Sequence, residues 1–377
     1  MFLVVFLSLY GLAHAYTYLK LQTLFRWTGF QRFFALGALL FLFISPVLGH
    51  VVASPETRWL DRIVLVVGYE WMGLLFLFIC AHLFLEALRL LVFLFNRTLA
   101  RGSIQGLPRT AYWVVSAAAV TVYVYGHFEV RDLRLETVEL TSPKVAHEAN
   151  PLRIVQITDL HFSAVNGAEL AARIAARVES LDPDLLAVTG DLVDRGISDP
   201  EEIQRIFRSI KAPLGKYAIV GNHEVYRGLQ ASVRFLEDAG FEVLRGEARS
   251  PLPWLTVIGV DDEAVGRVGR PQGRSLDDLL EEAPPENLTI LLRHRPIVEK
   301  ENPGRMDLQL SGHTHGGQIF PFGFVVARAF PYLKGVHTLG EGSVLYVSRG
   351  TGTWGPRIRV GSPPEITLIV YSSEKKQ

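Results

Sequence analysis

The chain has 377 residues, 49% of them hydrophobic, and a mean hydropathy of +0.23, which is high for a soluble protein. Its 38 basic and 38 acidic residues cancel, so bulk charge gives no reason to expect a nucleic-acid partner, and the single cysteine, Cys80, excludes a disulfide framework within one chain. The long apolar runs lie early in the chain. We therefore predict a transmembrane region over 1–127, a linker and first strand over 128–150, and a globular domain over 151–377.

Four early stretches are each close to the roughly 20 apolar residues that a helix needs to cross a bilayer. Glu70 lies inside the third stretch, where we expect its carboxyl group to face a neighbouring helix; a proton or ion pathway is the alternative. Ala13-His14-Ala15 is similar to a signal-peptide cleavage site, but no Lys or Arg precedes the apolar core, so we favour an uncleaved first helix. The four stretches cover residues 2–19, 33–53, 63–85 and 111–125.

Basic residues gather in the first and third loops between these stretches. By the positive-inside rule those loops are cytoplasmic, and the chain after the fourth stretch then lies outside the cytoplasm. We therefore expect a multi-pass protein of the inner cell membrane with an extracytoplasmic globular domain. The charges compared are Lys20, Arg26 and Arg32 in the first loop, Arg58 and Arg62 against Glu56 and Asp61 in the second, and Arg97, Arg101 and Arg109 in the third.

In the globular part, metal-binding residue types follow successive apolar strands. The alternation over 130–140 predicts a half-exposed strand, and the buried-strand pattern from Leu152 ends in Asp159 and His161. Side chains two residues apart on an extended chain share a face, so these two can bind one cation; a capping Asp beside a surface His is the alternative. The next strand ends in Gly190-Asp191, with Asp194 close behind, which an ordinary strand-to-helix turn with capping aspartates would also explain.

The pattern continues along the chain. The strand 216–220 ends in Gly221-Asn222-His223-Glu224, and helical spacing over 168–181 and 200–210 separates the strands. Such alternation places the strand ends at one edge of a sheet, where α/β folds build their sites. We expect the following helix to begin near residue 229 and Asp261-Asp262-Glu263 to form a solvated acidic turn. His294 follows the strand 288–292, where a lone His is usually structural, and His313 and His315 follow the run 308–310.

Taken in order, these blocks resemble the five motifs of the calcineurin-like metallophosphoesterase family, over about residues 152–371. The motifs are Asp159-x-His161, Gly190-Asp191-x-x-Asp194, Gly221-Asn222-His223-Glu224, His294 and Gly312-His313-x-His315. The form Gly-His-Thr-His-Gly-Gly-Gln and the segment from Tyr346 to Glu365 are similar to a membrane-anchored bacterial branch of predicted phosphodiesterases. Glu224 stands where Asp is commoner, and arginines flank His294.

The resemblance implies a four-layer α-β-β-α sandwich that holds two divalent metal ions, Mn, Fe or Zn. Carboxylate, amide and imidazole ligands suit these metals. One ion would take Asp159, His161, Asp191 and His315, and the other Asp191, Asn222, His294 and His313. A hydroxide between the metals would attack phosphorus, and His223 would protonate the leaving oxygen. Glu224 would orient His223, and Asp194 would support the ligands.

We therefore expect a membrane-anchored phosphohydrolase acting on a phosphodiester or pyrophosphate, with lipids among the candidate substrates. A pyrophosphatase of a UDP-diacylglucosamine-type lipid precursor is the alternative enzyme, and it needs a cytoplasmic active site. A metal-stabilised binding or sensor module is the alternative of another class; the proton donor His223 argues against it. A transport function regulated by the esterase domain rests on Glu70 alone. The aromatics over 319–324 and 330–333 are expected to pack under the site, or else to form an apolar lip for a lipid tail.

Overall fold

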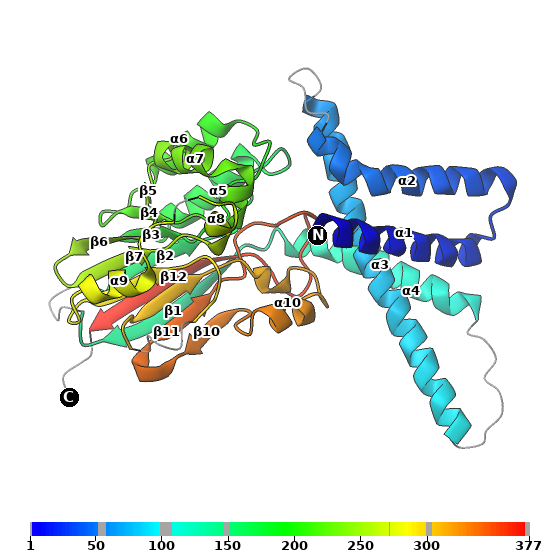
Figure 1. Ribbon diagram of the computed structural model, residues 1–377. Coiled ribbons are helices and arrows are strands. Elements are labelled where there is room, and N and C mark those ends of the chain that lie inside the picture. The colour runs from blue at the N-terminus through cyan, green and yellow to red at the C-terminus, as the bar shows by residue number, and fades with distance from the viewer. Residues whose placement is uncertain are drawn as a thin grey trace. The chain divides into compact units, whose positions relative to one another are not determined.

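The computed structural model describes residues 2–51, 58–98, 108–145, 151–270, 272–298 and 304–373. It divides into two compact units, one helical and one built on sheets (Figure 1). The helical unit comprises Met1–Glu129 and Gly355–Val360, and the second unit comprises Val130–Trp354 and Gly361–Gln377. Glu56 and Arg101, which entered the loop-charge comparison, lie outside the described residues.

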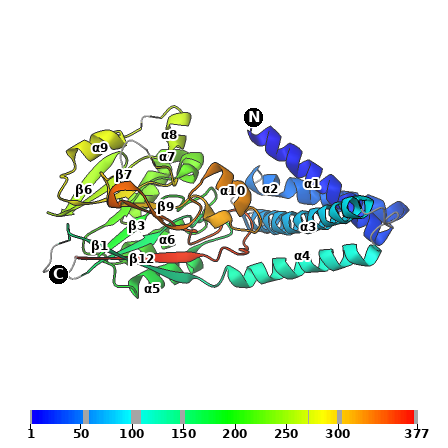
Figure 2. The ribbon, with the colours of Figure 1, turned by 90° about the horizontal axis from the view of Figure 1, so that it is seen from below.

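The helical unit contains a helix at each of the four expected stretches (Figure 2). Among the described residues, two segments, Gly29–Leu48 and Trp59–Phe95, are long and apolar enough to cross a membrane. The first and last helices are not among these segments, so two crossing candidates replace the predicted four. The helices are α1 (Phe2–Phe25), α2 (Gly29–Val51), α3 (Arg58–Thr98) and α4 (Arg109–Glu129).

Polar side chains within the helical unit pair with one another. Glu70 on α3 accepts a hydrogen bond from the Tyr123 hydroxyl of α4 at 2.9 Å and lies 3.0 Å from the Arg357 guanidinium. The expectation that Glu70 faces a neighbouring helix is therefore confirmed. Lys20 on α1 pairs with Glu86 on α3 at 2.6 Å in the same manner. Such pairing is what apolar surroundings demand of charged groups.

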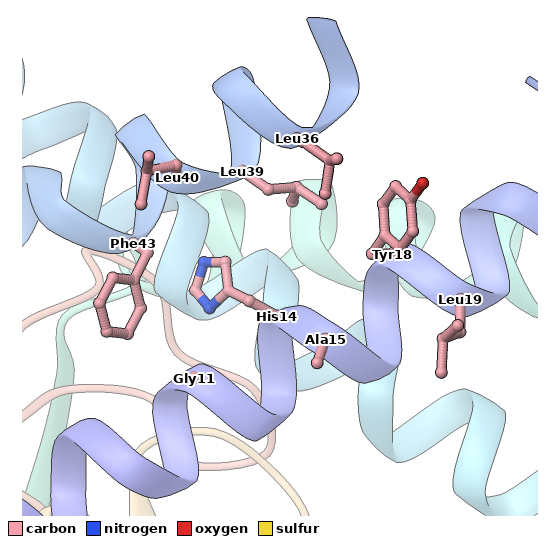
Figure 3. A pocket seen from close by; sticks show the side chains of 9 residues that line it. All are labelled: Gly11, His14, Ala15, Tyr18, Leu19, Leu36, Leu39, Leu40 and Phe43. Atoms are coloured by element: carbon pink, nitrogen blue, oxygen red, sulfur yellow. The ribbon is translucent and has the colours of Figure 1, made fainter. Parts of the chain in front are cut away.

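A pocket lies between α1 and α2 (Figure 3). Its lining is mostly apolar, with His14 and the hydroxyl group of Tyr18 as the polar exceptions, and Figure 3 places His14 opposite Phe43. Both ring nitrogens of His14 are engaged, Nδ1 with the Tyr10 carbonyl at 2.8 Å and Nε2 with the indole N–H of Trp71 at 2.8 Å. His14 therefore serves the packing of the helices, and the pocket lies outside the sheet-based unit that carries the metal-binding residue types.

The second unit is built on two six-stranded mixed sheets. Most neighbouring strands are parallel; the antiparallel pairs are β12 with β2, β10 with β11, and β6 with β7. The first sheet has the order β1 (Arg134–Ser142), β12 (Glu365–Ser373), β2 (Leu152–Ile157), β3 (Leu185–Val188), β4 (Lys216–Ala218), β5 (Glu242–Val243). The second has the order β10 (Gly335–Thr338), β11 (Val344–Val347), β9 (Leu308–Ser311), β8 (Leu288–Leu292), β7 (Leu255–Gly259), β6 (Glu247–Leu252).

Three apolar clusters define four layers. Side chains of β2 alternate in direction: Val155 and Ile157 pack with helices α5–α7, whereas Ile154 packs with strands of the second sheet. Leu279 of α9 belongs to a third cluster on the outer face of the second sheet. The predicted α-β-β-α architecture is thus confirmed. The helices are α5 (Ala168–Glu179), α6 (Pro200–Ser209), α7 (Asn222–Asp238), α8 (Glu263–Arg267), α9 (Leu276–Glu282) and α10 (Gly323–Ala329), with short 3-10 turns at His315–Gly317 and Gly340–Gly342.

Two local expectations need revision. Helix α7 begins at Asn222, earlier than expected, but Gly228, with φ 127°, breaks it, so a helical segment does begin at about residue 229 as predicted. The acidic turn after β7 is paired rather than solvated: Asp261 binds Arg245 at 2.8 Å, and Asp262 caps α8 and binds Arg295 at 2.7 Å. Arg245 precedes β7 and Arg295 follows β8, so neither arginine is adjacent to the acidic run in the sequence. The run of three acids alone therefore does not predict these ion pairs.

Candidate metal centre

The chain segments after β2, β3, β8 and β9, together with the start of α7, bring the predicted ligands together. After β2 and β9, the Nε2 atoms of His161 and His315 lie 3.1 Å apart, and His315 Nε2 lies 3.5 Å from the Asp159 carboxylate. After β3 and β8, His294 Nε2 lies 3.1 Å from Asp191 Oδ2. Three groups, each with one carboxylate and two imidazoles, have ligand atoms within 4.8 Å of one another: Asp159, His161 and His315; Asp191, His294 and His313; and His161, Asp194 and His223. The first two groups consist of predicted ligands.

Asp191 lies between the two groups. Its Oδ2 atom is 3.1 Å from His294 in one group and 4.0 Å from His161 in the other. Its Oδ1 atom accepts the backbone N–H of His223 at 2.8 Å, which ties the first turn of α7 to the site. One carboxylate thus serves both groups and orients the helix that carries Asn222.

The donor set fits divalent metals. The buried Asn222 Oδ1 meets no hydrogen-bond donor within the part of the chain that the structure describes, although a buried acceptor normally has a partner. His294 Nε2 and His313 Nδ1 also face each other at 3.1 Å, so both nitrogens are directed at one place. Oxygen and imidazole donors directed at a common buried point suit Mn, Fe or Zn.

The backbone of the site is strained. Five predicted ligands adopt the left-handed conformation, which is uncommon for residues other than glycine and costs roughly 1–3 kcal/mol each. Tight turns at the strand ends impose it, and they direct the side chains back toward one centre. These ligands, with φ between 51° and 71°, are Asp159, His161, Asp191, His313 and His315.

Gly190 makes one of these turns possible. Its φ is 94°, and a Cβ atom there would lie 2.6 Å from His294 Nδ1 and 2.8 Å from the backbone nitrogen of Gly221. No side chain fits, so this position needs glycine for both its conformation and its close packing.

Charges in the site are strongly coupled. Burial raises the pKa of the Asp159 carboxyl group. Burial would do the same for Asp191, but His294 and His223 outweigh it and hold the pKa of Asp191 well below its usual range. Burial opposes charge on His294, yet Asp191 raises the pKa of that imidazole to about 10, while burial and His294 lower the pKa of His313 to about 3. Buried carboxylates thus require a positive charge among them, which a divalent ion would supply.

His223 is oriented by Asp194, not by Glu224. Its Nδ1 atom lies 2.5 Å from Asp194 Oδ1, and the other oxygen of Asp194 lies 3.3 Å from His161 Nδ1. Burial disfavours charge on His223, but Asp191 and Asp194 outweigh it and raise the pKa of His223 to about 9. The expectation that Glu224 orients the ring of His223 is therefore wrong, because Asp194 is the carboxylate that contacts this ring.

Glu224 instead holds the backbone of the site. Its fully buried carboxylate accepts four backbone N–H groups: Asp191 at 2.9 Å and Gly221 at 2.8 Å on Oε2, and Leu192 at 2.7 Å and Val193 at 3.0 Å on Oε1. Burial and the charge of Asp191 raise the pKa of Glu224, but four facing donors leave no acceptor for a proton on either oxygen, so it accepts as a carboxylate.

Several residues near the site have no separate signal in the sequence. The backbone N–H groups of Thr351 and Gly352 donate to the carbonyls of Thr158 and Asp159 at 2.8 and 3.1 Å, so the segment before β12 braces the first ligand turn. Tyr226 and Trp354 lie against the ring of His223, with centroid separations of 5.6 and 5.7 Å. Tyr226 follows His223 by three residues on α7, a helical spacing that predicts contact, whereas no spacing rule predicts the contact of Trp354 with His223.

The aromatic segment after the last motif is largely exposed. Phe320, Phe322 and Phe324 are 61%, 44% and 74% exposed, and α10 has no buried residue. The expectation that these aromatics all pack under the site is wrong for these three. Phe330 does pack there, 4.9 Å from the ring of His313. The exposed segment therefore adjoins the metal centre through the aromatic contact of Phe330 with His313.

The sequence model of the calcineurin-like phosphoesterase family matches residues 152–317. An uncharacterized metallophosphoesterase of Aquifex aeolicus is 35% identical over 257 residues, which are 68% of this chain and 98% of that protein. The chain therefore belongs to the calcineurin-like metallophosphoesterase family, as the five motifs predict, and is a metal-dependent phosphoesterase.

Two other relatives are informative. A transmembrane protein with a metallophosphoesterase domain from Danio rerio is 31% identical over 62% of this chain, and the chain spans 56% of that protein. The UDP-2,3-diacylglucosamine pyrophosphatase LpxG of Chlamydia trachomatis is 28% identical over 70% of this chain and 97% of its own length.

Proposed function

We propose that the protein is a membrane-anchored phosphohydrolase that uses two divalent metal ions to cleave a phosphodiester or pyrophosphate bond. The observation that carries the proposal is the position of Asp191 between two ligand groups, with the unpartnered Asn222 oxygen beside them. Asp159, His161, Asp191 and His315 would hold one ion, and Asp191, Asn222, His294 and His313 the other. When bound, two such ions supply a nucleophilic hydroxide at neutral pH and neutralise charge on the phosphoryl oxygens.

His223 is the proposed general acid. With Nδ1 held by Asp194, its Nε2 atom is free of that bond and can donate a proton to the leaving oxygen. Asp194 fixes the ring and stabilises its charged form. A purely structural or sensory metal site has no use for a proton donor at this place, which favours catalysis over a binding module.

Lipid phosphates are the proposed substrate class. The relative LpxG is named for a diacylated sugar nucleotide, and this chain has two helices apolar enough to cross a bilayer. The exposed aromatics Phe320, Phe322 and Phe324 adjoin the site and would contact acyl chains. The second candidate is hydrolysis of a UDP-diacylglucosamine-type precursor, which favours a cytoplasmic active site. We propose the multi-pass arrangement with the catalytic unit outside the cytoplasm, and a C-terminal reporter active only there tests it.

The test of catalysis uses the full chain in detergent micelles, stripped of metal and reloaded with Mn, Zn or Fe. We expect metal-restored hydrolysis of an aryl phosphodiester, with at least a hundredfold loss in Asp191→Asn and His223→Ala. Asp132→Asn and His337→Ala are the matched controls, because Asp132 pairs only locally with Arg134 and His337 lies on β10. A folded chain that binds metal but cleaves neither diesters nor pyrophosphates would instead support the binding-module alternative.

A further inference from the structure

We propose that Tyr226 and Trp354 form a leaving-group subsite that selects substrates whose departing group carries a ring with an apolar face. This inference rests on the proposed function, in which His223 protonates the leaving oxygen. The two rings flank that imidazole, both edge-on, with centroids 5.6 and 5.7 Å away. A group bonded to the oxygen that His223 protonates must therefore lie beside one or both rings.

Both rings are exposed although their backbones are fixed. Tyr226 is 51% exposed and Trp354 is 52% exposed. The Arg195 guanidinium donates to the Tyr226 carbonyl at 2.6 and 3.0 Å. An aromatic ring half open to water loses hydrophobic stabilisation unless something covers it, and a fixed one binds a ligand at low entropic cost.

Gln318, the last residue of the Gly-His-Thr-His-Gly-Gly-Gln motif, holds the backbone of Trp354 in place. Its side-chain amide donates to the Trp354 carbonyl at 3.0 Å, and its side-chain oxygen accepts the Trp354 backbone N–H at 3.0 Å. This paired contact links the loop of His313 and His315 to the tryptophan. Gln318 is thus a positioning residue for the subsite, and Tyr226, three residues after His223 on α7, reaches the same imidazole from the other segment.

The chemistry of the subsite fits a ring with an apolar face, either a nucleobase or a pyranose. Both stack on tyrosine and tryptophan, and base stacking on aromatic side chains contributes about 1–3 kcal/mol per ring. An alkyl chain would gain contact area but no stacking geometry. The exposed aromatics on and before α10 are a separate surface, so ring recognition beside His223 and acyl contact there do not exclude each other.

The experiment compares two methyl phosphodiesters whose leaving groups have similar acidity, phenol and hexafluoroisopropanol, with the metal-loaded full chain. We expect Trp354→Ala and Tyr226→Ala to lower kcat/KM for the phenyl ester about 5- to 50-fold while changing the ringless ester less than about twofold. Trp354→Phe and Tyr226→Phe keep an aromatic ring and should retain most of the phenyl preference. The nearly unchanged hydrolysis of the ringless ester shows that the Ala variants fold. Gln318→Ala should lose part of the preference, and Val336→Ala, an exposed apolar position on β10, should lose none.

Product inhibition distinguishes the two ring types. Inhibition by a nucleoside 5′-monophosphate that weakens in Trp354→Ala assigns the subsite to a nucleobase, and the same result with glucosamine 1-phosphate assigns it to a sugar. Equal loss on both esters, or inhibition by both products that no substitution changes, would overturn the inference. Failure of the wild-type chain to cleave either ester with any metal would instead refute the proposed function.

Discussion

Replacing Glu224 by Gln tests how the ligand turn is held. The carboxylate accepts two N–H groups on each oxygen, from Gly221 and Asp191 on one and from Leu192 and Val193 on the other. An amide in either orientation keeps one oxygen and turns an NH2 group toward the other two donors. Two buried donors then lack acceptors, at about 1–3 kcal/mol each, so we expect a loss of about 2–6 kcal/mol.

A domain of 150–250 residues loses about 2–4 °C in Tm per kcal/mol, so the substitution should lower the main transition of the metal-loaded chain by roughly 4–24 °C. Calorimetry of the detergent-solubilised protein measures this. Activity should fall as well, because Asp191 moves with the released backbone. Glu202→Gln is the matched control, since its side chain is exposed on α6 and pairs with Arg205 of the same helix. A Tm for Glu224→Gln within 1 °C of the wild type, with full activity, would refute this account.

Three other changes have defined outcomes. Removing metal with a chelator should lower Tm, because a ligand at 100 times its Kd stabilises the folded state by about 2.7 kcal/mol, and Mn or Zn should restore it; a Tm indifferent to metal would contradict the ligand assignment. Gly190→Ala should abolish metal-dependent activity, because the added methyl group meets His294, and retained activity would show that the turn can relax. The double change Phe322→Ser with Phe324→Ser should lower turnover of a lipid phosphodiester in mixed micelles by at least tenfold and spare a soluble diester, since covering even one Phe side chain contributes about 1.5–3 kcal/mol; equal losses on both substrates would argue against a lipid lip.

The sequence predicts which residues are the metal ligands better than it predicts the hydrogen bonds and ion pairs that hold those ligands in place. Asp159 and Asp191 follow the neighbouring parallel strands β2 and β3, whose ends meet whatever the details of the turns. His294 follows β8 of the second sheet, and the strand pattern alone does not place it beside them. The four layers follow from the family resemblance instead, because the apolar alternation along β2 requires partners on both faces but does not say that one of them is a second sheet.

The supporting contacts depend on three-dimensional proximity that no spacing rule provides. The sequence suggests that Glu224 orients His223, but the first turn of α7 directs its carboxylate toward the backbone of residues 191–193. The acids after β7 read as solvated because Arg245 and Arg295 lie elsewhere in the chain. The grouping of Gly355–Val360 with the helical unit is likewise a tertiary contact, through Arg357 and Glu70.

Asp194 shows why the second motif has its spacing. Asp191 and Asp194 are three residues apart on one turn, and their carboxylates serve different neighbours: Asp191 lies between the two ligand groups, whereas Asp194 binds the imidazoles of His161 and His223. One oxygen of Asp194 orients a proposed metal ligand and the other orients the proposed general acid. A shift of this turn would therefore displace the metal and the proton donor together. The proposed hydrolysis needs the metal ions and the proton donor at one phosphorus atom. A single short turn, whose backbone N–H groups bind the Glu224 carboxylate, sets the distance between them.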